Sequence, residues 1–240
     1  MTALLVALAF AAPGQFVALD RVDPTILQDM RYATSYNFVG RRIDGYREPV
    51  CILTRKAARA LRRAQADLQP KGYGLKVYDC YRPTRAVEQF ARWAANLADQ
   101  KMKREFYPRV DKRRAFELGY IAHRSGHSRG STVDVTLVRL PPRTQPAWDG
   151  RLRSCFARFR RRFADNGVNM GTNYDCIDPR AHTSDPRIKG RPHRNRMRLK
   201  RALERRGFEP YANEWWHFTL RDEPYPEKYF DFPVARDSLR

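Results

Sequence analysis

One segment constrains the fold more than any other, because residues 131–140 read STVDVTLVRL. Valine and leucine alternate there with other residues, which is typical of a half-buried β-strand. Pro141-Pro142 ends the segment. A strand of this kind requires a sheet in which to pair. Asp134 falls inside its apolar pattern, where an unpaired carboxylate is costly, so this residue needs a partner such as a metal ion.

Helical patterns surround this strand. Thr54 is a good N-cap for a helix that Pro70 and Gly72 end. The apolar positions predicted to face inward on this helix are Ala57, Leu61, Ala64 and Leu68. Further helices are predicted after Pro83-Thr84 (Val87, Phe90, Ala94 and Leu97 inward), over 151–164 (Leu152, Phe156, Phe159 and Phe163 inward) and over 195–206 before Gly207 (Leu199, Ala202 and Leu203 inward).

Strand patterns are also found at residues 75–81 and 218–220, whereas residues 20–50 show no regular pattern. Helices and strands are interspersed without a regular βαβ rhythm. The sequence therefore predicts a single α+β domain with a central, mainly antiparallel sheet flanked by helices.

The 240 residues carry a formal net charge of +21, mostly from arginine. A charge of this size suggests that the protein could bind an anionic partner. Aromatic residues make up 12% of the chain, which excludes a disordered tail. The arginine-rich stretch 191–206 could contact phosphates, but no nucleic-acid-binding motif accompanies it and its other face carries core residues. We therefore expect a solvated helix face and no specific nucleic acid, with at most weak contact with an anionic wall or membrane surface.

The N-terminus resembles an export signal, because residues 3–12 are apolar and end in small residues. No basic residue precedes Arg21, so the signal is incomplete. We predict that residues 1–19 are a signal peptide or N-terminal extension and that the protein is periplasmic or exported. A buried N-terminal element in a cytoplasmic protein is the alternative.

Four cysteines are present, and none forms a C-x-x-C pair. In an exported chain an even number permits two disulfides. Because each pair is close in sequence, we hypothesise Cys51–Cys80 and Cys155–Cys176 bonds. Four buried free thiols are the alternative.

Two segments carry chemistry: SGHSRGSTVD at 125–134 and EWWH at 214–217. His127, Asp134 and His217 provide two imidazoles and a carboxylate, which suit a hydrolytic zinc site with one open position. Glu214 is the candidate to take and return the proton of the attacking water. The remaining histidines are assigned no role and are His123, His182 and His193.

These segments resemble the VanX-type D-alanyl-D-alanine dipeptidases, as do the blocks at 30–40, 78–90 and 170–175 and the sequence EWWHFTLRDEPYPEKYFDFP. The resemblance implies the hedgehog-like fold of the D,D-peptidases and one Zn²⁺ per chain, bound by His127, Asp134 and His217. It also implies that Glu214 is the general base and acid, and that Arg82 stabilises the transition state.

The resemblance further places Tyr32 and Asp175 near the substrate's ammonium and Ser125 near its carboxylate. It implies zinc-dependent hydrolysis of a small D,D-dipeptide to D-alanine by metal-activated water. The alternatives are a D,D-carboxypeptidase or endopeptidase on cell-wall peptides, or a non-catalytic zinc module that binds anionic polymers. The dipeptidase domain is expected over 20–240, with an inserted segment at about 143–166 that distinguishes the chain from compact relatives.

Overall fold

The computed structural model describes residues 12–239, so residues 1–11 of the predicted signal or extension at 1–19 lie outside the described residues. The central sheet has five strands in the order β2-β4-β5-β7-β6, and a separate pair joins β1 to β3. The strands are β1 (Phe16–Ala18), β2 (Leu27–Gln28), β3 (Ile52–Thr54), β4 (Tyr73–Asp79), β5 (Thr132–Arg139), β6 (Phe208–Pro210) and β7 (His217–Leu220). Only β2 and β4 pair in parallel within these sheets, which confirms the predicted mainly antiparallel α+β fold.

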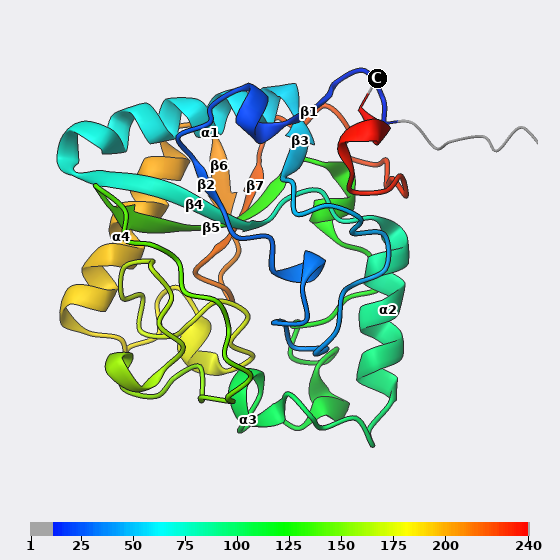
Figure 1. The fold of residues 1–240 in the computed structure, drawn as a ribbon, viewed down its shortest axis with the longest axis vertical. Coiled ribbons are helices and arrows are strands. Elements are labelled where there is room, and N and C mark those ends of the chain that lie inside the picture. The colour runs from blue at the N-terminus through cyan, green and yellow to red at the C-terminus, as the bar shows by residue number, and fades with distance from the viewer. Residues whose placement is uncertain (1–11, 240) are drawn as a thin grey trace, which may run out of the picture.

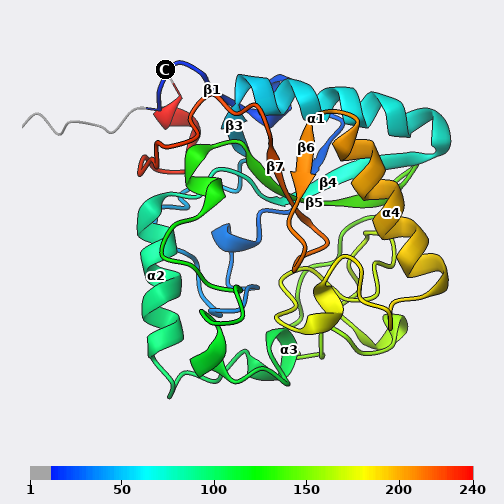
Figure 2. The same ribbon diagram turned by 180° about the vertical axis from the view of Figure 1, so that it is seen from behind.

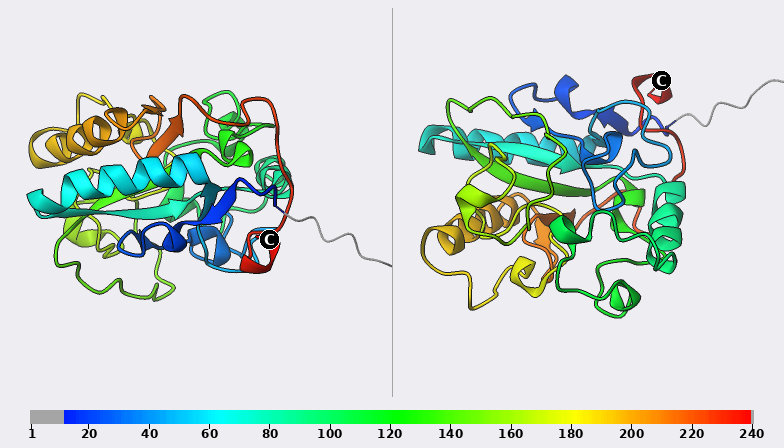
Figure 3. Two further views of the ribbon diagram at one scale, coloured as in Figure 1. Left: turned by 90° about the horizontal axis from the view of Figure 1, so that it is seen from above. Right: turned by 60° about the horizontal axis from the view of Figure 1, so that its bottom comes forward.

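Four α-helices complete the described fold: α1 (Arg55–Leu68), α2 (Thr84–Ala95), α3 (Lys103–Phe106) and α4 (Gly190–Glu204). In Figure 1, α1 lies along the top of the sheet, while α2 and long irregular segments lie below it. α4 packs on the side shown in Figure 2, and the view from above in Figure 3 shows it beside α1. No helix in residues 12–239 is long and apolar enough to cross a membrane.

The register of β5 decides which side chains meet. Val77 pairs with Val135 on β4 and β5, and Asp134 pairs with His217 on β5 and β7. Because successive residues of a strand point to opposite faces, the valines join the apolar core with α1 and α4. Asp134 and His217 then emerge together on the opposite face of the sheet.

The N-cap and apolar pattern of α1 are confirmed. The Thr54 hydroxyl accepts a hydrogen bond from the Ala57 amide at 3.4 Å, and the four predicted inward positions are all buried. α4 begins at Gly190, before its predicted start, because Pro192 is tolerated in a first turn, where its missing N–H is not needed. Gly207 follows α4 with a φ of +88°, the left-handed conformation expected after a helix.

The helix predicted at 151–164 is wrong, because the segment is irregular except for the 3₁₀ turn Phe159–Arg161. Its backbone groups bond to distant partners instead: the Cys155 amide donates to the Glu105 carbonyl at 2.9 Å, and the Cys155 carbonyl accepts from the Asn173 amide at 2.8 Å. Phe159, predicted to face inward, is 42% exposed.

The predicted inward position of Leu97 is also wrong. α2 ends at Ala95, and the Leu97 side chain is 46% exposed. Both predicted disulfides, Cys51–Cys80 and Cys155–Cys176, are confirmed, and no described cysteine is free.

Candidate active site

Three short elements bring the predicted ligands together. His127 lies in the 3₁₀ turn Gly126–Arg129, which Ser125 caps by accepting the His127 amide. Gly130 then turns the chain into β5 with a φ of +82°, and a Cβ at this position would lie 2.1 Å from the Phe16 ring. This tight turn places His127 beside Asp134, and the β5–β7 register adds His217.

The three atoms that could bind a metal lie close to one another. His127 Nε2 lies 3.2 Å from Asp134 Oδ1 and 3.3 Å from His217 Nδ1, and His217 Nδ1 lies 3.1 Å from Asp134 Oδ1. His127 Nδ1 donates to the Cys80 carbonyl at 2.6 Å, so its Nε2 lone pair faces the cluster. Imidazole ligands of metals are commonly held in this way. Three atoms that can each offer an electron pair lie at the separation expected around one ion, so the residues fit a metal ion.

Electrostatics within the cluster favour a charged Asp134 carboxylate and a neutral His217 imidazole. Burial alone raises the pKa of Asp134, but the neighbouring imidazoles of His127 and His217 lower it to well below its ordinary value. Burial lowers the pKa of His217. These are the protonation states that a metal ligand requires.

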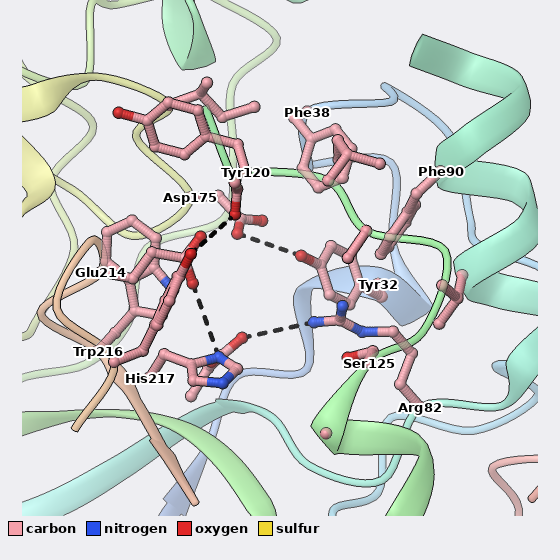
Figure 4. A pocket seen from close by; sticks show the side chains of 18 of the residues that line it. Tyr32, Phe38, Arg82, Phe90, Tyr120, Ser125, Asp175, Glu214, Trp216 and His217 are labelled. Carbon is pink, nitrogen blue, oxygen red and sulfur yellow. Dashed lines mark hydrogen bonds and ion pairs between the residues drawn. The ribbon is translucent and has the colours of Figure 1, made fainter. Parts of the chain in front are cut away.

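Glu214 and Arg82 flank the cluster from different sides (Figure 4). Glu214 Oε2 is 3.6 Å from His217 Nδ1, and burial, reinforced by the charges of Asp134 and Asp175, raises the pKa of Glu214 well above its ordinary value. The Arg82 Nε donates to Asp79 Oδ2 at 2.9 Å, and an Arg82 terminal nitrogen lies 3.7 Å from Asp134 Oδ2.

Asp175 and Tyr32, which are both predicted to lie near the substrate's ammonium, contact each other. The Tyr32 hydroxyl donates to Asp175 Oδ1 at 3.1 Å (Figure 4), while Asp175 Oδ2 is buried without a hydrogen-bond partner. Burial, with the charge of Asp134, raises the pKa of Asp175 well above its ordinary value. Ser125 also lines the pocket.

These side chains share one pocket of about 290 Å³, which is at the small end of ligand sites, roughly 300–1,000 Å³. Aromatic rings supply much of its remaining wall, from Tyr32, Phe38, Phe90, Tyr120, Tyr211 and Trp216. Among residues 12–239, the His127–Asp134–His217 group is the one cluster suited to a metal, and His123, His182 and His193 do not join it.

The sequence analysis missed two polar residues behind the site. Asp79 is fully buried and accepts from Arg82 and from the Tyr46 hydroxyl, the latter at 2.6 Å. Tyr174 donates to Asp134 Oδ2 at 2.9 Å. A signal existed for Asp79, since it is a carboxylate within a buried strand, as Asp134 is. No local signal distinguishes Tyr174 from an ordinary core tyrosine.

An α+β domain that gathers two imidazoles, several carboxylates and a guanidinium around one small pocket has the composition of a hydrolase site. The family model described as D-ala-D-ala dipeptidase matches residues 13–144 and 157–235. The chain therefore belongs to the D-ala-D-ala dipeptidase family of peptidases.

Two relatives that are similar in sequence agree with this assignment. The chain is 39% identical over 219 residues to a D-alanyl-D-alanine dipeptidase of Enterococcus faecium, covering 91% of this chain and 98% of the relative. It is 38% identical over 222 residues to one from Streptomyces coelicolor, covering 92% and 99%. A crystal structure of a vancomycin resistance D,D-pentapeptidase mutant in complex with Zn(II) has a TM-score of 0.38 and 14% identity, covering 82% of this chain and 86% of that chain.

Proposed function

We propose that this protein is a zinc-dependent D-alanyl-D-alanine dipeptidase, which hydrolyses the free dipeptide to two molecules of D-alanine. The observation that carries the proposal is the His127–Asp134–His217 cluster, of which Asp134 and His217 line the pocket that also holds Glu214 and Arg82. Two imidazoles and one carboxylate are a typical catalytic ligand set for one zinc ion, with a coordination position left open.

Different residues of the site contribute to different parts of the hydrolysis. Zinc in this site supplies Lewis acidity and lowers the pKa of water. Glu214 takes the proton of the attacking water and returns it to the departing amine, and its raised pKa suits a group that holds a proton between the two steps. Arg82, fixed by Asp79, stabilises the negative charge that develops on the amide oxygen.

The charges of the pocket suit the two ends of a free dipeptide. Asp175 Oδ2 lacks a partner and would accept a hydrogen bond from the substrate's ammonium, beside the Tyr32 hydroxyl. The Ser125 oxygen accepts the His127 amide, which leaves its own O–H free to donate to the substrate's carboxylate. The small pocket volume favours a dipeptide over a longer peptide.

The test is release of D-alanine from D-Ala-D-Ala, with and without a chelator. Glu214→Ala should retain zinc and lose activity, whereas His127→Ala should lose both. Glu209→Ala, which removes an exposed glutamate on β6, is the matched control and should keep both. Full turnover by Glu214→Ala would refute the mechanism.

The same assay separates the rival functions. A pentapeptide ending in D-Ala-D-Ala should be a poor substrate, because its amino-terminal extension would meet Asp175 and Tyr32. Faster cleavage of the pentapeptide would favour a D,D-carboxypeptidase. Zinc binding and salt-sensitive retention on an anionic wall polymer, without hydrolysis of either peptide, would favour a non-catalytic module.

We also propose an exported, periplasmic location. Its support is the two disulfides, which persist in oxidising compartments and are rare in the cytosol. Fractionation of producing cells, with thiol titration of each fraction under denaturing conditions, tests this location. Recovery of the protein in the cytoplasm with four reactive thiols would contradict it.

A further inference from the structure

The Cys155–Cys176 disulfide lies beside the substrate pocket, since Cys176 directly follows Asp175 in the chain. Both cysteines are buried. The chemistry described above makes no use of this bond. Its position raises the question of what the bond does for Asp175.

The backbone of Asp175 is unusual. Its φ is +57°, and no other non-glycine residue in 12–239 has a positive φ. An L residue adopts this left-handed conformation at an energetic cost, and it persists only where the surrounding structure imposes it. The direction of the Asp175 carboxylate therefore depends on how its neighbours are held.

Hydrogen bonds tie the chain on both sides of Asp175. The Asn173 amide donates to the Cys155 carbonyl at 2.8 Å, and the Ile177 amide donates to the Phe106 carbonyl at 2.8 Å. Cys155 thus provides one of these two anchors.

Cys155 itself belongs to a long segment without regular secondary structure. Between β5 and α4 the described chain forms no α-helix or β-strand apart from an isolated bridge at Gly167. The Cys155 amide bonds to the Glu105 carbonyl at 2.9 Å, and the covalent bond to Cys176 is the strongest link between this segment and the pocket wall. Apart from that link, the hydrogen bonds between this segment and residues 173–177 are those that Asn173 donates to the Cys155 and Phe163 carbonyls.

One oxygen of the Asp175 carboxylate has no hydrogen-bond partner and could therefore accept a hydrogen bond from a ligand. Oδ1 accepts from Tyr32, whereas Oδ2 is buried and has no partner, and the residue lines the pocket with 7% of its surface exposed. Buried polar atoms are nearly always hydrogen-bonded. A cationic donor from the substrate satisfies this oxygen only if the carboxylate keeps its present direction.

We propose that Cys155 and Cys176 are positioning residues, whose disulfide holds Asp175 in its left-handed conformation and thereby sets the preference for a substrate with a free amino terminus. The inference rests on the proposed function, in which Asp175 receives the substrate's ammonium. When the bond is absent, residue 175 relaxes to negative φ, and its carboxylate turns away from the ammonium position.

The experiment compares D-Ala-D-Ala with N-acetyl-D-Ala-D-Ala, which lacks the ammonium group. The measured quantity is the ratio of kcat/KM for the free dipeptide to that for the acetylated one. In Cys155→Ala/Cys176→Ala this ratio should fall by about tenfold to a hundredfold, the range of a charge-assisted hydrogen bond. The fall should come mainly from KM for the free dipeptide, and zinc content should not change.

Two reference variants make the result specific. Asp175→Asn should lower the ratio to a similar value. Cys51→Ala/Cys80→Ala removes the other disulfide, far from Asp175 in sequence, and should reduce stability and activity on both substrates while leaving the ratio unchanged. If the Cys155 and Cys176 variant does not fold, the same ratio is measured on folded wild-type protein in which alkylation shows these two thiols reduced.

An unchanged ratio without the Cys155–Cys176 bond, together with a lowered ratio in Asp175→Asn, would overturn the inference and leave the proposed function intact. An unchanged ratio in Asp175→Asn would refute both the ammonium role of Asp175 and the inference built on it. Absence of D-Ala-D-Ala hydrolysis by the wild type would refute the proposed function itself.

Discussion

Tyr174→Phe should weaken metal binding although Tyr174 is not a ligand. Its hydroxyl donates to Asp134 Oδ2 at 2.9 Å, while Asp134 Oδ1 faces the two histidines. The hydrogen bond fixes the rotation of the carboxylate about its own axis. Phenylalanine preserves the ring and its packing, so the substitution removes this hydrogen bond and little else.

The magnitude follows from the charge and burial of the acceptor. Asp134 is 2% exposed, so water cannot readily replace the lost donor. Hydrogen bonds to charged groups contribute about 1.5–3 kcal/mol, which corresponds to roughly a tenfold to hundredfold change in a dissociation constant. Substitutions of residues that orient metal ligands typically cost about the same factor. We therefore expect zinc affinity to fall by about 10- to 100-fold.

Competition with a chromophoric chelator measures the zinc dissociation constant directly, without reference to activity. Tyr78→Phe is the matched control, because the Tyr78 ring stacks on Tyr174 with centroids 4.4 Å apart but its hydroxyl donates to Asp165 at 2.9 Å. That variant should bind zinc within about twofold of the wild type. Equal zinc affinity in Tyr174→Phe and the wild type would refute the reasoning.

Three further predictions address stability. Burial raises the pKa of Asp165, but the charges of Lys76 and Arg31 lower it to about 2. The associated stability of about 2 kcal/mol is present above pH ~4 and lost as the pH falls towards 2. Urea unfolding across this range should show a flatter pH dependence in Asp165→Asn, and an equal slope would contradict the prediction. Leu61→Ala, at a fully buried position of α1, should lower the free energy of unfolding by about 2–5 kcal/mol. Arg62 is exposed, so Arg62→Ala should change this free energy by less than about 0.5 kcal/mol. Chemical denaturation of the two variants measures the difference. Zinc at about 100 times its dissociation constant should stabilise the fold by about 2.7 kcal/mol and so raise the Tm. A chelator should reverse this rise. A Tm that zinc leaves unchanged would argue against a preformed metal site.

The charge of the chain has a partly structural explanation that the sequence did not reveal. Arg196, within the arginine-rich stretch, is 1% exposed and donates to the carbonyls of Met170, Arg180 and His182 at 2.6–2.8 Å. It therefore holds the segment that leads to Asp175 rather than a surface partner. The pattern of α4 could not separate it from the exposed arginines, because the carbonyls it meets lie elsewhere in the chain.

The sequence by itself determined the local elements, because caps, periodicity and turn residues act over a few positions. It located α1 with its Thr54 cap, the central strand β5 and both disulfide pairs. It also named the residues of the candidate site, through short motifs and the resemblance that they carry. Each of these predictions depends on residues that are close in the chain or on a pattern that a family shares.

Only the tertiary structure decided which distant groups meet. The β5–β7 register sets Asp134 opposite His217, and Tyr174 reaches Asp134 from a loop 40 residues away. The predicted helix at 151–164 failed for the same reason, since Cys155 uses its backbone groups and its sulfur to bind partners outside the segment. Local propensity is worth only tenths of a kcal/mol per residue, so a covalent bond and several buried hydrogen bonds override it.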